Sequence, residues 1–119
     1  MGTFHVQLEI GDPARDRFVP VEALVGTGST YTVLPRAILR ELGVSADRRA
    51  RFVLADGSEV EREVGRAWVR FEGREEYTLV VFGADALLGA VTLEEFLLAP
   101  DPVERRLVPV PALMKRIAA

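Results

Sequence analysis

The chain has 119 residues, of which 49% are hydrophobic and 28% are charged. These values fit one compact domain over residues 1–119 with a packed core, and they argue against a disordered chain. The formal net charge is −3, and no basic block stands out, so the sequence gives no footprint for nucleic acid. The chain has no Cys and only one His, which excludes disulfides, thiol catalysis and Cys-based or multi-His metal sites; no cofactor is expected.

Residues 4–10 and 18–25 are predicted to be the two strands of a β-hairpin. Phe4, Val6, Leu8 and Ile10 alternate with polar residues, so His5 falls on the polar face and is a poor catalytic candidate. The turn signal Gly-Asp-Pro at 11–13 separates the strands. The alternation is lost at residues 23–25, which suggests that the second strand enters the core there.

A glycine-rich pentapeptide, Gly-Thr-Gly-Ser-Thr, follows at residues 26–30. Taken alone, it fits an ordinary turn without chemistry. A short strand is predicted next, over 31–34, because the segment is rich in β-forming residues. Pro35 then opens a helix over 36–42 with Ile38, Leu39 and Leu42 as its apolar stripe, and Gly43 ends it.

The middle of the chain is predicted to be a run of β-hairpins. Residues 45–51 are interpreted as a polar linker, and a strand is expected over 52–55. Asp56-Gly57 is typical of a type I′ turn. Further strands are expected over 58–64, 67–71 and 77–82, with a turn at 72–74.

Residues 86–89, Ala-Leu-Leu-Gly, resemble residues 23–26, Ala-Leu-Val-Gly, and a helix is predicted after them over 91–98. A last, proline-interrupted β segment is expected around Leu107, Val108 and Val110, and residues 112–119 as a short helix or frayed end. Glycines and an Asp interrupt the apolar stretch 77–93, so no membrane span is expected. No signal peptide is visible at the start, and a cytoplasmic protein is the default expectation.

In order and spacing, these elements resemble the retropepsin-like aspartic proteases, in particular small bacterial members of the family. The resemblance rests on the apolar run before Gly26-Thr27-Gly28-Ser29, on the hairpin at 52–64, and on Leu87-Leu88-Gly89 with its following helix. It implies a mainly β fold with a closed sheet, a flap hairpin and one or two short helices. The flap residues would be Ala55, Asp56, Gly57 and Ser58, and Leu87, Leu88 and Gly89 would form a structural second loop.

The family's mechanism, as the resemblance implies it, uses two aspartates that share one proton. One carboxylate acts as base on a water while the protonated partner polarises the scissile carbonyl. A chain with one such loop holds half of the site, so two copies would form a homodimer around an extended peptide or protein substrate. Thr27 would lock the two loops across the dimer axis, Gly28 would allow a close turn, and Ser29 would support the carboxylate.

Gly26 occupies the position of the catalytic Asp, and two interpretations of it stay open. In the first, the natural protein is an aspartic endopeptidase and Gly26 is an inactivating substitution. The intact remainder of the loop favours this interpretation. In the second, Gly26 is native and the protein is a non-catalytic homodimeric module that binds peptides.

Overall fold

The computed structural model describes residues 2–26 and 28–112. The described residues are mainly β, as the sequence predicts. The elements are β1 (Phe4–Gly11), β2 (Phe18–Val25), β3 (Thr32–Pro35), α1 (Arg36–Glu41), β4 (Ala46–Val53), β5 (Glu59–Phe71), β6 (Arg74–Gly83), α2 (Ala90–Phe96), β7 (Leu98–Asp101) and β8 (Arg106–Pro109). None of the helices among these residues is long and apolar enough to cross a membrane.

One six-stranded sheet forms the body of the molecule. Its order is β2-β1-β5-β6-β3, and β4 pairs with β5 off this path. All these pairs are antiparallel except β3 with β6, which run parallel. Leu87 forms bridges to both Leu24 on β2 and Val33 on β3, so the segment after β6 joins the two ends of the sheet. β7 and β8 form a separate two-stranded sheet.

The core lies between the sheet and the two short helices. Alternate residues of β1 and β2 point into it, and it is covered by Leu39 of α1, by the C-cap residue Leu42, and by Leu93 and Phe96 of α2. The apolar stripe predicted for the first helix is therefore confirmed, with Ile38 at its half-buried edge. Gly43 has φ +77° directly after the C-cap, the left-handed conformation expected of a glycine that ends a helix.

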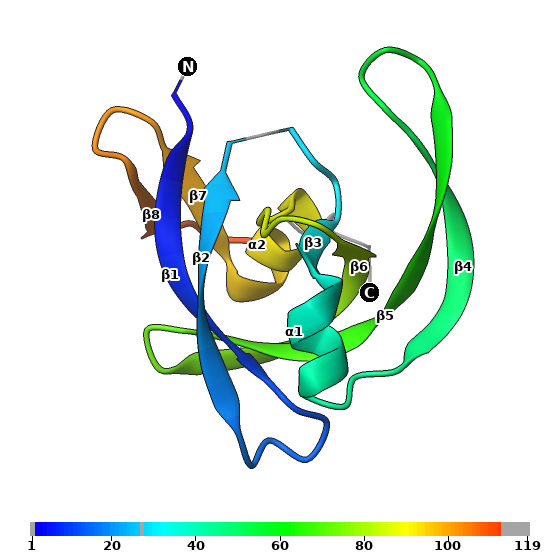
Figure 1. Cartoon of the computed structure of the whole chain (residues 1–119). Helices are drawn as coiled ribbons and strands as arrows, with labels where there is room; N and C mark the ends of the chain where they lie inside the picture. Colours follow the sequence, from blue (N-terminus) through cyan, green and yellow to red (C-terminus); the bar gives the residue numbers. More distant parts are fainter. Residues whose placement is uncertain (1, 27, 113–119) are drawn as a thin grey trace, which may run out of the picture.

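The β4–β5 hairpin extends away from the body, and Figure 1 shows it curving outward beside α1 and β3. We call its outer part, residues 46–64, the distal hairpin. The prediction of a polar linker over 45–51 is wrong, because β4 covers Ala46–Val53. Most of β4 is exposed on both faces, so it lacks the apolar alternation by which strands are recognised in a sequence.

The turn at the tip of the distal hairpin also differs from the type I′ prediction. Gly57 has φ +86°, but Asp56 is not among the residues with positive φ, and a type I′ turn needs both. The N–H of Gly57 donates to Leu54 O, and the N–H of Leu54 donates to Ser58 O. This is a three-residue loop in which Gly57 supplies the left-handed position. A two-residue turn with two positive φ values occurs instead at Glu72 and Gly73, between β5 and β6.

The second helix ends earlier than predicted. α2 stops at Phe96, and Leu97 takes a left-handed conformation with φ +57°. Leu98, predicted to be helical, begins β7. The apolar residues Leu97 and Leu98 continue the helical pattern, so the sequence gives no stop signal here. The segment expected around Leu107 and Val108 is β8, and the predicted tail lies mostly outside the described residues.

Candidate active-site cleft

The segment that leaves β2 carries the position at which the resemblance predicts a catalytic Asp. β2 ends at Val25, which is fully buried, and Gly26 emerges exposed with φ +90°. L-residues rarely adopt this conformation. Thr27, the predicted dimer-locking residue, lies outside the described residues. Gly28 again has positive φ, at +78°, and Ser29 donates from its Oγ to the carbonyl of Tyr31 at 2.7 Å.

Residues 86–89 lie directly against this segment, as main-chain hydrogen bonds show. Leu24 exchanges bonds with the second segment on both sides: its N–H donates to Ala86 O at 2.9 Å, and its carbonyl accepts from Leu88 N at 2.9 Å. Leu87 exchanges two 2.9 Å bonds with Val33 of β3. The two segments that look alike in sequence are therefore neighbours in space, and the second one holds the first in position.

Gly89 lies against the main chain of Tyr31 and Thr32, at the start of β3. A Cβ at this position would lie 2.3 Å from the carbonyl carbon of Tyr31 and 2.6 Å from Thr32 N, which no side chain can tolerate. The N–H of Gly89 donates to Thr32 Oγ1 at 3.0 Å. Ala90 and Val91 then donate their N–H groups to the carbonyls of Ser29 and Thr30.

Three fully buried threonines continue this contact beneath the loop. Thr92 Oγ1 lies 2.6 Å from Thr32 Oγ1 and 2.9 Å from Thr78 Oγ1. The hydroxyls thus connect α2, β3 and β6 inside an apolar core. No buried side-chain polar atom of the described residues lacks a partner. The sequence analysis missed this network, since threonine has no distinctive hydropathy pattern.

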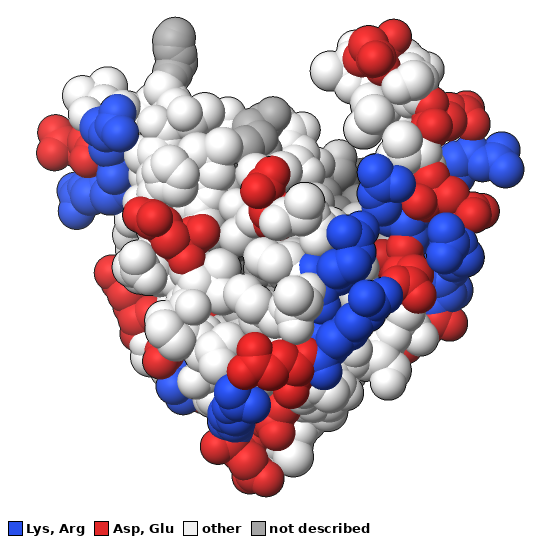
Figure 2. Space-filling view, in the orientation of Figure 1, with Lys and Arg blue, Asp and Glu red and all other residues white. Residues whose placement is uncertain are grey.

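The distal hairpin forms the opposite wall of a cleft of about 470 Å³, which Figure 2 shows as a hollow between the hairpin and the body. The ring of Tyr31 meets that of Phe52 edge-on, with centroids 6.2 Å apart, and so links the loop to the hairpin. The lining residues are Gly28, Ser29, Thr30, Tyr31, Val33, Arg51, Phe52, Val53, Leu54, Val60, Arg62, Val81, Gly83 and Leu87.

The structure brings some of the predicted site residues together and leaves others apart. Gly28, Ser29 and Leu87 line the cleft. Leu88 and Gly89 are buried behind it, and Gly26 lies outside its lining. The tip residues at 55–58 are exposed and do not line the cleft of a single chain. Sequence reasoning missed Tyr31 and Phe52, although two aromatic residues flanking the loop and the hairpin were a visible signal.

The tip of the distal hairpin is stabilised by its own side chains. Asp56 accepts bonds at one carboxylate oxygen from Ser58 Oγ at 2.6 Å and from Ser58 N at 2.9 Å. These hydrogen bonds, that from the hydroxyl first, lower the pKa of Asp56 below its ordinary value. Asp56 thus serves turn geometry and stays ionised. The adjacent apolar residues Val53 and Leu54 are 69% and 46% exposed, so the tip presents apolar surface beside the cleft.

The cleft lacks the acid–base chemistry of an aspartic protease. Its described lining residues include two arginines and no Asp or Glu. Within residues 2–26 and 28–112, no three His, Asp or Glu side chains are grouped as a metal site requires. Asp85, the acidic residue nearest in sequence to the second segment, is exposed. The described lining of the cleft in a single copy therefore offers shape and hydrogen-bonding surface, but no carboxylate that could act as a general base.

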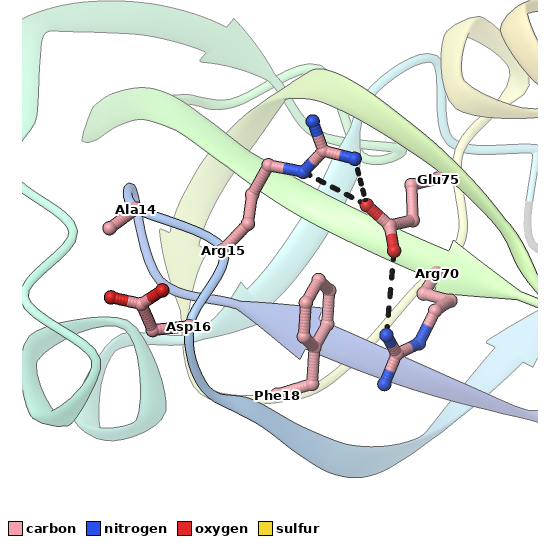
Figure 3. A pocket seen from close by; sticks show the side chains of 6 residues that line it. All are labelled: Ala14, Arg15, Asp16, Phe18, Arg70 and Glu75. Carbon is pink, nitrogen blue, oxygen red and sulfur yellow. Dashed lines mark hydrogen bonds and ion pairs between the residues drawn. The ribbon is translucent and has the colours of Figure 1, made fainter.

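A second concave surface, distant from these segments, is a structural ion-pair network (Figure 3). Glu75 accepts from Arg15 Nε at 3.0 Å and pairs with Arg70 at 3.4 Å, while Arg70 also binds Glu9 at 2.8 Å. The bond from Arg15 is the main cause that lowers the pKa of Glu75. The guanidinium of Arg70 also lies 3.8 Å from the centre of the Phe18 ring. These groups satisfy one another and join the β1–β2 turn to β5 and β6.

Comparison with known proteins agrees with this geometry. The sequence profile described as "Aspartyl protease" matches residues 6–93. The EIAV protease complexed with the inhibitor HBY-793 is 23% identical, with a TM-score of 0.57 over 77% of this chain and 86% of that one. The Simian Foamy Virus (mac) protease is 18% identical, with a TM-score of 0.56 over 81% and 98%.

The retroviral protease-like domain of Ddi1 from Leishmania major is also similar in structure. It is 19% identical, with a TM-score of 0.60 over 92% of this chain and 89% of that one. No curated protein sequence matches the chain. The profile covers most of the sequence and the three structures share the fold, so the resemblance is confirmed: this chain belongs to the aspartyl protease family and has the retropepsin-like fold.

Proposed function

We propose that the chain forms a homodimeric, peptide-binding cleft of the aspartic endopeptidase type, which in the presence of Gly26 binds extended peptide without hydrolysing it. The observation that carries the proposal is the cleft itself. It lies between the loop after β2 and the distal hairpin, and residues 28–31 of that loop form one wall. The distal hairpin acts as the flap, with its exposed Val53 and Leu54 closing over a bound peptide.

The edge of the sheet supports recognition of an extended peptide. Among the described residues, β4 pairs only with β5, and its other edge has no strand partner there. A peptide strand can add to such an edge through main-chain bonds, with alternate side chains facing the cleft. This mode of binding does not depend on a carboxylate at position 26.

Hydrolysis, in this proposal, depends on position 26 in two copies. Across a twofold axis the two loops place their equivalent residues next to each other. Two Asp residues there share one proton and titrate as a pair, so that one activates water and the other polarises the carbonyl. Gly26 removes both groups at once. Thr27 next to it is proposed to lock the loops together, and Ser29 to support the carboxylate.

The conformation of Gly26 favours a second candidate, a natively non-catalytic peptide-binding module. With φ +90°, the loop has a shape suited to glycine, and a Cβ would come within 3.1 Å of Gly2 O. A loop in which Asp had been replaced by Gly for study would need no such adaptation. The intact Ser29 and the tightly packed Gly89 support the first candidate instead.

The Gly26→Asp variant separates the candidates. If the natural protein is an endopeptidase, this variant cleaves members of a random peptide library at mildly acidic pH, and the unaltered chain cleaves none. A variant that sediments as a dimer and yet cleaves nothing would refute the endopeptidase. Peptide binding by the unaltered chain tests the second candidate, and a chain that stays monomeric at high concentration contradicts both.

A further inference from the structure

The two faces of the distal hairpin carry different charge. In the register of β4 and β5, Phe52 lies opposite Val60, and Arg62 lies two residues further on the same face. All three residues line the cleft, and Phe52 contacts the ring of Tyr31, so this is the inner face. The glutamates of β5 alternate with these residues and therefore point to the outer face.

The outer face is neutralised by ion pairs between the strands. Arg49 Nε lies 3.0 Å from Glu61 Oε1, and Arg51 lies 3.7 Å from Glu59. Arg51 also borders the cleft, but its guanidinium is paired with this outer carboxylate. Arg49 and Arg51 of β4 are thus balanced by acidic residues of β5. Arg48, opposite Val64, has no carboxylate partner among the described residues, but it does not line the cleft.

Arg62 differs from Arg49 and Arg51 because its charge is not balanced. The one hydrogen bond of its guanidinium, from Nη1 at 3.0 Å, goes to the main-chain carbonyl of Glu61. No carboxylate pairs with it in the part of the chain that the structure describes. Figure 2 shows basic side chains along the inner side of the β4–β5 hairpin, beside the hollow.

The composition of the cleft strengthens the effect of this charge. Apolar side chains such as Val33, Phe52 and Val81 line the same cleft as Arg62, and no acidic residue is among the described lining residues. With Gly26 in the loop, the negative charge of an aspartate pair is missing as well. A peptide in the cleft therefore meets a positively charged, mainly apolar surface.

We infer that Arg62 is a specificity-determining residue, and that the cleft prefers peptides in which an acidic side chain faces the distal hairpin. The inference rests on the proposed peptide-binding function. A Glu or Asp at that peptide position pairs with the Arg62 guanidinium, whose remaining N–H donors can form a bidentate contact with a carboxylate. In a homodimer, the twofold axis repeats this contact on the other side of the cleft.

The test is a charge scan of a peptide probe. The probe is a fluorescein-labelled eight-residue peptide of apolar residues, in which Glu, Gln or Lys is placed at each position in turn. Fluorescence anisotropy gives the dissociation constants at low and high salt. At the best position we expect Glu to bind about two- to fivefold more tightly than Gln, the range for exposed ion pairs, and salt to weaken the preference.

Variants of the chain assign the preference to one residue. Arg62→Gln should abolish it, Arg62→Lys should keep much of it, and Arg62→Glu should reverse it in favour of Lys. Arg49→Gln is the matched control, because it removes an equal charge from the outer face of the same hairpin. Both side chains are exposed, so neither change should disturb folding.

The outcomes separate this inference from the function on which it rests. If peptides bind without regard to charge, or if Arg62→Gln retains the preference, the role of Arg62 is refuted while peptide binding stands. Equal losses in Arg49→Gln and Arg62→Gln also refute it, because they show a general effect of net charge. If no peptide in the scan binds at any salt concentration, the proposed function fails, and the inference fails with it.

Discussion

Residues 23–26 and 86–89 have similar sequences and lie side by side, yet a glycine is needed at the end of each for a different structural reason. Gly89 is buried, with an ordinary φ of −94°, and is required because the main chain of Tyr31 and Thr32 lies directly against it. Gly26 is exposed and is suited to its place by its positive φ. The comparison separates stability from chemistry: the second segment maintains the fold, and the first segment holds the position on which hydrolysis would depend in the proposed function.

Replacement of Gly89 should break the fold most severely. In Gly89→Ala, the new Cβ meets main chain at 2.3 Å, and main-chain atoms cannot move aside as a side chain can. We expect a loss of about 3 kcal/mol or more in the free energy of unfolding, measured by urea denaturation. Gly28→Ala is the control for backbone strain alone: no other described residue lies within 4 Å of its Cβ position, and its φ of +78° should cost only about 1–2 kcal/mol. Equal losses in the two variants would contradict the packing argument.

The threonine network should have the next largest effect. Thr92→Val keeps the shape of the side chain but removes the hydroxyl that lies between Thr32 and Thr78. The buried partners lose their bonds, so we expect a destabilisation of about 1–3 kcal/mol by urea denaturation. Thr3→Val, at an exposed position, should change little. A Thr92→Val variant as stable as the unaltered chain would show that the network contributes nothing.

Replacement of Gly26 should lower the free energy of unfolding by a smaller amount, as the conformation of this residue predicts. In Gly26→Ala, an L-residue must adopt φ near +90° or the loop must change shape, which should cost about 1–2 kcal/mol in thermal or urea unfolding. A stability equal to that of the unaltered chain would mean that the loop changes shape freely. That result would remove the argument for a natively non-catalytic module.

The surface ion pairs should have the smallest effect, and it should depend on pH. Arg15 lowers the pKa of Glu75 below its ordinary value of 4.5. The ionised form is therefore favoured in the folded state, and its contribution is present above pH 4.5 and is lost as the pH falls through the lowered pKa. Glu75→Gln should reduce the acid-induced fall in melting temperature. Glu95→Gln, on the exposed side of α2, should not, and an unchanged profile in Glu75→Gln would contradict the assignment.

Much of the fold was predictable because apolar periodicity reports burial. β2 was predicted with its observed boundaries, and the stripe of α1 was identified from Leu39 and Leu42. β4 escaped prediction because it is exposed on both faces. The end of α2 at Leu97 was also hidden, since an apolar residue in a left-handed conformation leaves no signal in the sequence.

The site was predictable where it depends on glycines and hydroxyls in a fixed order, and not where it depends on tertiary contacts. The likeness of residues 23–26 and 86–89 was visible in the sequence, but the adjacency of Leu24 and Leu88 is known only from the main-chain hydrogen bonds. The pairing of Tyr31 with Phe52, and the isolation of Arg62 from the glutamates beside it, depend on strand register and sheet curvature. The alternation of Arg and Glu along β4 and β5 does not show, from the sequence alone, which face of the hairpin lines the cleft.

The most direct measurement tests whether cleavage requires an Asp at position 26 in both subunits of one dimer. The Gly26→Asp variant is mixed with the unaltered chain at constant total concentration, allowed to exchange subunits, and assayed for peptide cleavage. If one dimer needs two aspartates, an equal mixture keeps about one quarter of the activity of the pure variant, because only that share of dimers has both. Retention of about one half, as independent single-chain sites require, would contradict the account, and so would a pure Gly26→Asp variant that cleaves nothing.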